Sequence, residues 1–344
     1  MKVLLVPVSA ARGFGEYARA REIALAVQRR WPEAQLHFVL SAQAPYAAQC
    51  PFPATLLPGS ATLHTPQVLQ LLAALRPDIV IFDNAGRTAQ IRAAHAAGAR
   101  VVYISSRRRQ RAKAFRFRWM RMLSEHWIAY PRFIAGEPGW LEQLKLKVAG
   151  GPRLRFLDTL LPVAAVAAAE LLPDLRDFVL VVPGGGTAHP GARAAPDIIG
   201  AAATALAARG LPTILVGVAP TSGSGLLWCL PLLPQAQLIE LMRRARLVVS
   251  NGGDTMVQAL ACGCACVAVP IAHDQAAHIA RCQERRLLLA APLEAGAISA
   301  TVAALHADDE VRRQLLARVR AAGITDAMPQ VLEALAMLAA QGSR

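Results

Sequence analysis

Two glycine-rich segments in the second half of the chain could hold an anion. Each follows an apolar run, at 178–183 and 247–250. The residues concerned are Gly184, Gly185, Gly186 and Thr187 in the first segment, and Asn251, Gly252, Gly253, Asp254 and Thr255 in the second. Glycine lets backbone approach a ligand closely, and a helix that begins after such a turn offers free N–H groups and positive dipole to a phosphate. The segments therefore predict a phosphate site, with ordinary tight strand-to-helix turns as the alternative.

A third polar turn has a regular spacing from the second. Gln258 falls on the helix expected after Thr255, and Gly263 and Pro270 follow it five and twelve residues later. His273, Asp274 and Gln275 then come after the apolar run 266–270, with the last two at sixteen and seventeen residues from Gln258. Taken alone, without the spacing, His273 and Asp274 are typical of a solvated loop.

The spacing of these two turns resembles the donor-binding signature of GT-B nucleotide-sugar glycosyltransferases. It is similar to the UDP-glycosyltransferases and to glycosyltransferase family 28, the peptidoglycan-precursor N-acetylglucosaminyltransferase type. The resemblance implies that the glycine turns hold a donor diphosphate, that Gln258 lies at the ribose, and that Asp274 and Gln275 bond the donor sugar. The chain departs from the pattern at Gln258, where Glu is usual, and at His278, where Asn is frequent.

The loop after the first apolar run carries a carboxylate that could act as a base. Gly13 and Gly15 precede Glu16, and in the resembling families this loop faces the acceptor, with a catalytic His at the position of Glu16. A carboxylate can take the proton of an acceptor hydroxyl. The alternative is that Glu16 only stabilises the first turn of a helix. Asp83, at the end of another apolar run, is the competing base, or else it fixes the following loop; His64 is a weaker candidate.

A strongly basic segment lies between these regions. Residues 107–121 read RRRQRAKAFRFRWMR, with eight cations in fifteen residues and no acid. Cations mixed with aromatic residues can meet an anionic membrane or a nucleic acid, or they form a solvated face. We expect an acceptor or membrane surface, and nucleic acid is the less favoured partner. The residues assigned to it are Arg107, Arg108, Arg109, Arg111, Phe115 and Trp119.

Alternating strands and helices must position these residues. Apolar strands are expected at 2–8, 36–41, 78–83, 100–105, 126–131, 178–183, 212–218, 247–250 and 266–270, separated by helices, one of them from Arg107 to Leu123. His126 and Trp127, at the start of a strand, are expected in the core. This order predicts an α/β fold of two Rossmann-like, doubly wound domains facing a cleft, as in GT-B. The expected domains are an acceptor-side domain, 1–155, and a nucleotide-sugar donor domain, 156–344.

Composition narrows the class of protein. The chain of 344 residues is 54% hydrophobic and 17% charged, with a net charge of +14, which excludes a disordered chain. Its six cysteines, three of them in the sequence CGCAC, indicate no disulfide scaffold. We expect no metal and no cofactor, and a cytoplasmic protein that contacts the inner face of the membrane peripherally.

These observations together predict an inverting glycosyltransferase. It would transfer a sugar from a nucleotide-sugar to a hydroxyl of a lipid-linked or anionic acceptor, and it would need no metal. The family resemblance implies that the donor is a UDP-sugar. A nucleotide-sugar hydrolase or epimerase of the same fold is the enzymatic alternative, and a basic nucleic-acid-binding protein is the other.

Overall fold

The structure, a computed structural model, describes residues 1–10, 14–162, 175–184, 194–217 and 225–342. It divides into two compact units, Met1–Leu160 with Ala327–Arg344, and Leu161–Asp326. The division expected from the sequence, 1–155 and 156–344, differs because the last helix belongs to the first unit. The predicted α/β class of two parallel sheets is confirmed.

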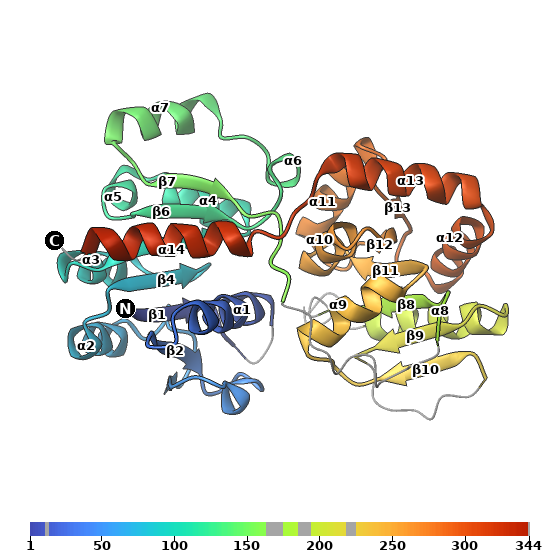
Figure 1. Ribbon diagram of the computed structural model, residues 1–344, viewed down its shortest axis with the longest axis horizontal. Coiled ribbons are helices and arrows are strands. Elements are labelled where there is room, and N and C mark those ends of the chain that lie inside the picture. Colours follow the sequence, from blue (N-terminus) through green and yellow to red (C-terminus); the bar gives the residue numbers. More distant parts are fainter. Residues whose placement is uncertain (11–13, 163–174, 185–193, 218–224, 343–344) are drawn as a thin grey trace. The chain divides into compact units, whose positions relative to one another are not determined.

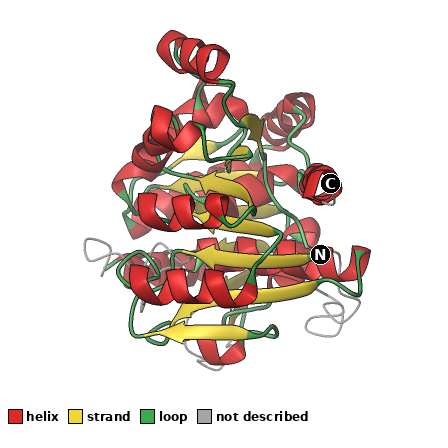
Figure 2. Cartoon of the chain, turned by 90° about the vertical axis from the view of Figure 1, so that its left-hand side faces the viewer, coloured by secondary structure: helices red, strands yellow, loops and turns green. Residues whose placement is uncertain are grey.

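The first unit is built on a seven-stranded sheet in the order β3-β2-β1-β4-β5-β6-β7, and its strand pairs are parallel. Helices cover both faces of this sheet (Figure 2). The strands are β1 Lys2–Pro7, β2 Gln35–Ser41, β3 Ala54–Leu57, β4 Ile79–Asp83, β5 Arg100–Ser105, β6 Glu125–Ile128 and β7 Arg153–Phe156. The helices are α1 Gly15–Arg30, the short 3-10 helix η1 Ala47–Gln49, α2 Thr65–Leu75, α3 Thr88–Ala96, α4 Arg108–Ala114, α5 Phe117–Met120, α6 Arg132–Ala135, α7 Trp140–Ala149 and α14 Met328–Gly342.

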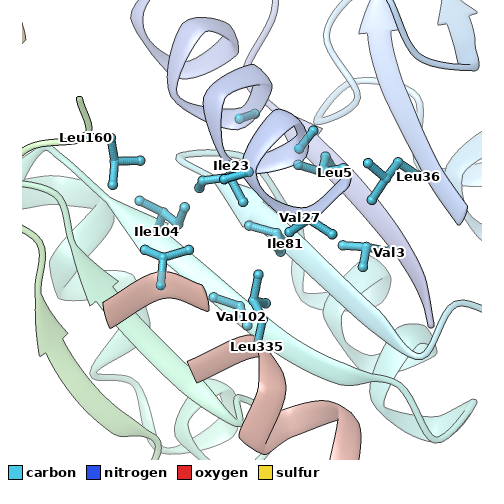
Figure 3. Close-up of a cluster of buried hydrophobic side chains, with 14 of the residues drawn as sticks. Val3, Leu5, Ile23, Val27, Leu36, Ile81, Val102, Ile104, Leu160 and Leu335 are labelled. Atoms are coloured by element: carbon cyan, nitrogen blue, oxygen red, sulfur yellow. The ribbon is translucent and has the colours of Figure 1, made fainter. Parts of the chain in front are cut away.

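Alternating side chains of the central strand β1 point to opposite faces of the first sheet and build two cores. On one face, Val3 and Leu5 pack with Ile23 of α1 and with Leu335 of α14 (Figure 3). On the other face, Leu4 packs with apolar residues of α2, α3 and α5. Because both faces are covered, β1 is apolar after Lys2 rather than alternating. The C-terminal helix α14 thus helps to cover the first face.

The second unit contains a six-stranded sheet in the order β10-β9-β8-β11-β12-β13, again with parallel pairs. Its strands are β8 Val179–Val182, β9 Thr213–Val216, β10 Leu227–Leu230, β11 Leu247–Asn251, β12 Ala265–Val269 and β13 Leu289–Ala290. Its helices are α8 Ala195–Ala208, α9 Gln235–Arg244, α10 Asp254–Ala261, α11 His273–Glu284, α12 Ala295–Ala307 and α13 Asp309–Ala322. Figure 1 shows these elements in colours that run from yellow-green at β8 to orange-red at α13. The carboxyl ends of β8, β11 and β12 lie at one edge, where open α/β sheets bind ligands.

The basic segment differs from its prediction. Instead of one helix from Arg107 to Leu123, the structure has α4 and α5, separated at Phe115 and Arg116. Phe115 is the C-cap of α4, and its ring lies in the core, 5.3 Å from the His126 ring.

Candidate functional site

The two glycine turns of the second unit are joined by one side chain. Asn251, the last residue of β11, is buried, and its Nδ2 donates a hydrogen bond to the Pro183 carbonyl at 2.7 Å. Its Oδ1 accepts from the Gly253 N–H at 2.8 Å. Since β8 and β11 are neighbouring parallel strands, Asn251 fixes the turn after each strand against the other. The sequence grouped these residues, but it did not show that Asn251 links them.

Packing leaves little room for a side chain at these glycines. Gly184 has φ +71°, and a Cβ there would lie 2.4 Å from Asn251 Nδ2 and 3.3 Å from Thr255 Oγ1. A Cβ on Gly252 would lie 2.8 Å from the Gln275 carbonyl oxygen, and one on Gly253 would lie 2.9 Å from Asn251 Oδ1. The separations below 3.0 Å are too short for a Cβ unless a neighbouring atom moves, so the turns from Gly184 and from Gly252 to Thr255 pack tightly together.

Helix α10 begins directly after these glycines. Gly253 is its N-cap, and Asp254 and Thr255 are half-buried in its first turn. The first N–H groups of a helix have no partner within the helix, and the dipole makes this end attractive to anions. Gln258 follows one turn later and is 7% exposed. Gly13, Gly185, Gly186 and Thr187 lie outside the described residues.

The third turn, between β12 and α11, packs against the second. Gln275 Oε1 accepts from the Ile271 N–H at 3.0 Å, and the residue is buried. His278 Nδ1 lies 3.2 Å from the Gly252 carbonyl, and burial lowers the pKa of this histidine. A neutral ring that donates from Nδ1 satisfies both observations. His273 and Asp274 are exposed in the first turn of α11, so the structure places them at the surface while Gln275 shapes the turn.

In the first unit, Glu16 meets residues from two other loops. Asn84 Nδ2 donates to Glu16 Oε1 at 3.0 Å, and Arg107 Nη2 lies 3.5 Å from the same oxygen. Glu16 follows Gly15 at the start of α1, Asn84 follows β4 and Arg107 precedes α4. The strands β1, β4 and β5 are adjacent, so their carboxyl ends bring these side chains together.

Asn84 is itself rigidly held. Its backbone has φ +51°, in the left-handed region that Asn tolerates better than most residues. Its Oδ1 accepts from the Ser106 N–H at 3.0 Å, and its Nδ2 also donates to Ser106 Oγ at 2.6 Å. The sequence pointed to Asp83 at this strand end, whereas the residue that contacts Glu16 is the next one, Asn84.

Asp83 forms a buried ion pair. Arg19 donates from Nε to Asp83 Oδ2 at 2.7 Å and from Nη2 to Oδ1 at 3.1 Å. The two side chains are 8% and 1% exposed. Both carboxylate oxygens thus accept from a helix α1 cation, which ties α1 to the end of β4. This geometry favours a structural role for Asp83, in which it holds the end of β4 against α1, over a role as the catalytic base.

His126 and Trp127 are in the core, as predicted. His126 is 1% exposed and its Nε2 lies 2.9 Å from Ser105 Oγ. Burial lowers the pKa of His126 to about 3. The ring is therefore neutral near neutral pH and belongs to the packing of the sheet.

The prediction that the aromatic and basic residues of segment 107–121 form one exposed surface is wrong for three of them. Phe115 and Trp119 are each 3% exposed, because both rings pack into the core beside His126 and Tyr103. Arg111 is also buried and donates to the carbonyls of Ala135 and Gly136. The exposed cations of the segment are Arg107, Arg108, Arg109, Arg116, Arg118 and Arg121.

Within the described ranges, no group of three or more His, Cys, Asp and Glu side chains is arranged to hold a metal ion. Of the CGCAC cysteines, Cys264 and Cys266 are buried, and burial raises the pKa of both thiols. They are packed side chains at the junction of α10 and β12. No helix in the described part of the chain is long and apolar enough to cross a membrane.

Comparison with known proteins gives no match to a family model and none to a curated protein sequence. Solved structures do match over nearly the whole chain. A UDP-glucosyltransferase from Polygonum tinctorium capable of glucosylating indoxyl is 14% identical, with a TM-score of 0.68 and 98% of each chain covered. UGT2 of Phytolacca americana, complexed with UDP-2fluoro-glucose and pterostilbene, is 13% identical, with a TM-score of 0.70 and 100% of each chain covered. The glycosyltransferase SnogD from Streptomyces nogalater is 17% identical, with a TM-score of 0.63, and covers 98% of this chain and 99% of its own. At these identities the likeness concerns the fold, and the chain has the GT-B fold of these glycosyltransferases.

Proposed function

We propose that this protein transfers a sugar from a nucleoside-diphosphate donor to an acceptor hydroxyl. The observation that carries the proposal is the link through Asn251, which joins the turns after β8 and β11 beside the start of α10. Among structures with the same fold, UGT2 of Phytolacca americana holds a UDP-sugar and Arabidopsis thaliana UGT89C1 holds UDP. A UDP-linked donor is therefore the first to test.

The diphosphate is assigned to the start of α10. The Gly253 N–H is held by Asn251, so backbone N–H groups of the first turn of α10 after it and the Thr255 hydroxyl would hold the diphosphate oxygens, with Gly184 allowing close approach. This arrangement stabilises a leaving diphosphate without a metal, because fixed N–H dipoles act on the developing charge. Gln258 is assigned to the ribose. Asp274 and His273 are assigned to the donor sugar, and Gln275 to positioning that turn.

The base is assigned to Glu16. In an inverting transfer, the acceptor oxygen forms a bond to the anomeric carbon while the bond from that carbon to the diphosphate oxygen breaks. The carboxylate takes the hydroxyl proton, and the diphosphate leaves with the bonding electrons. The contacts from Asn84 and Arg107 both reach Oε1, so Oε2 is the oxygen that would accept this proton.

A lipid-linked or anionic acceptor is proposed on the charge beside Glu16. Arg107 contacts the carboxylate and is 47% exposed, and Arg108 and Arg109 follow it at the surface. An anionic group on the acceptor would be attracted to these cations and would bring its hydroxyl toward Glu16. For a lipid-linked acceptor, the protein would act at the inner face of the membrane.

A product assay tests this function. The chain is incubated with a panel of nucleotide-sugars, with and without anionic and lipid-linked alcohols, and nucleoside diphosphate and sugar products are quantified by mass spectrometry. The proposal expects diphosphate release that depends on the acceptor, with a glycosylated product. Free sugar formed at the same rate without acceptor would indicate the hydrolase instead. Salt-sensitive nucleic-acid binding with no response to any nucleotide-sugar would indicate the nucleic-acid-binding alternative.

A further inference from the structure

One face of helix α7 exposes large apolar side chains. Trp140, Leu141, Leu144 and Val148 are 73%, 51%, 50% and 72% exposed. Positions three, four and eight apart lie on the same side of a helix, so these four side chains fall within roughly a quarter of its circumference. Water-exposed apolar residues are ordinary when scattered, but a contiguous group on one helix face indicates a surface that another apolar phase covers.

The opposite side of α7 is anchored to the protein. Glu142 Oε2 accepts from the Arg111 guanidinium at 3.2 Å and from the Gly139 N–H at the start of the helix at 3.0 Å. Residue 142 lies roughly opposite the apolar stripe on a helical projection. This anchor therefore sets which side of α7 faces away from the unit. In Figure 1, α7 lies at the β7 edge of the first sheet, at the periphery of the unit.

Cations flank the apolar stripe. Lys147 and Lys145 project on its two sides, and the Lys145 Nζ lies 5.8 Å from the centre of the Phe117 ring. Phe117, on the adjoining helix α5, is itself 47% exposed. Arg116, Arg118 and Arg121 of that region are exposed as well. The nearby acids are occupied, since Glu142 pairs with Arg111 and Glu137 pairs with Arg132.

We infer that α7 and Phe117 form a docking surface for an anionic lipid bilayer. An apolar face bordered by Lys and Arg, with a Trp at one end, is the arrangement that lies in a membrane interface. The apolar side chains enter the headgroup region and the flanking cations meet the acidic lipids. A second copy of the chain fits less well, because a symmetric contact would place the same cations against each other.

This surface differs from the one expected from the sequence. Phe115 and Trp119 are buried, so the apolar part of the membrane contact comes from α7 and α5. The inference deepens the acceptor part of the proposed function, because it names the surface that would bring the protein to a lipid-linked acceptor. It is independent of donor binding, which is assigned to the second unit.

Vesicle sedimentation tests the inference. The full chain is mixed with phosphatidylcholine vesicles and with vesicles that contain about a third phosphatidylglycerol, where each surface cation adds to binding. Leu144→Glu is compared with Leu232→Glu, the same change at an 83% exposed leucine of the second unit. We expect the unchanged chain and Leu232→Glu to bind the anionic vesicles. Leu144→Glu should lower the partition coefficient by about tenfold or more, because a charge replaces an inserted apolar side chain.

Several results decide the matter. Two results together support the anionic bilayer. The double variant Lys145→Glu/Lys147→Glu loses binding to the anionic vesicles, and the unchanged chain binds pure phosphatidylcholine vesicles more weakly than anionic ones. No vesicle binding by the unchanged chain, or equal binding by Leu144→Glu, overturns it. A dimer in sedimentation velocity that Leu144→Glu dissociates, without any effect on vesicles, assigns the surface to a second copy instead. UDP affinity is measured in parallel, so failure of donor binding is seen separately.

Discussion

Asn84 donates its side-chain amide to Glu16 across 3.0 Å, while its own backbone is held in the left-handed region at φ +51°. The contact joins the loop after β4 to the first turn of α1. The hydrogen bond holds Oε1 of Glu16 in place. Because the carboxylate is planar and rigid, the direction of Oε2 is then fixed as well. A carboxylate that only stabilised the helix would need no such partner from another loop.

Glu16→Gln should separate the base from the helix cap. The amide preserves the shape of the side chain but cannot take a proton, so turnover should fall by about 10²- to 10⁴-fold. UDP affinity should remain unchanged. Glu22→Gln, the same substitution on the same helix, is the control and should keep its turnover. A variant at Glu16 with normal turnover and a lower melting temperature would assign this residue to the cap alone.

Asn84→Asp should shift the pH dependence of turnover. Aspartate tolerates the same backbone conformation and can still accept from the Ser106 N–H, but it places a negative oxygen where the amide donates to Glu16. Two nearby carboxylates favour protonation of one of them. The pH below which turnover declines should therefore move upward, with turnover regained at high pH. A profile that is merely scaled down at every pH would contradict a positioning role for Asn84.

Asp83→Asn should act on stability. The substitution leaves the buried Arg19 guanidinium without its carboxylate, and breaking a buried ion pair from one side costs about 3–5 kcal/mol. Urea unfolding measures the loss. A variant of unchanged stability that loses turnover would instead make Asp83 the base.

His126 should make the folded state sensitive to acid. Its pKa is lowered by burial from 6.5 to about 3, so the unfolded chain binds a proton in this pH range and the folded chain does not. The contribution to stability is complete above pH 6.5 and is lost as the pH falls toward 3, by up to about 1.4 kcal/mol per pH unit. In His126→Gln this part of the slope should disappear. The unfolding free energy of both chains is measured between pH 3 and 6.5. If it changes with pH by the same slope in both, His126 is not a source of the acid sensitivity.

The sequence predicted the central strands well because they are buried on both faces. The run 100–105 coincides with β5, and 247–250 falls one residue short of β11. Edge strands were not predicted. β7 alternates charged and apolar residues as RLRF, and β13 has two residues, so neither resembles a buried run. Their pairing depends on neighbours that no local pattern specifies.

The same limit applies to the site. Glycine spacing located the turns after β8 and β11, but only packing shows that Gly252 is pressed against Gln275 and that Asn251 bonds across to Pro183. The aromatic residues of the basic segment illustrate the opposite case. On the single helix expected from Arg107 to Leu123, Phe115 and Trp119 would share one stripe. Cations surround that stripe on several sides, so the local pattern could not decide whether it faced water or the core.

Isothermal titration calorimetry with UDP tests the central claim most directly. The unchanged chain is compared with Gly253→Val, where a Cβ would lie 2.9 Å from Asn251 Oδ1, and with Gly200→Val, where a Cβ in the same unit meets nothing within 4 Å. We predict that UDP binds the unchanged chain and Gly200→Val alike and that Gly253→Val loses this binding while it remains folded by circular dichroism. Equal UDP affinity in all three chains, or no binding to the unchanged chain by UDP or any other nucleoside diphosphate, would contradict the assignment of the donor to the linked turns.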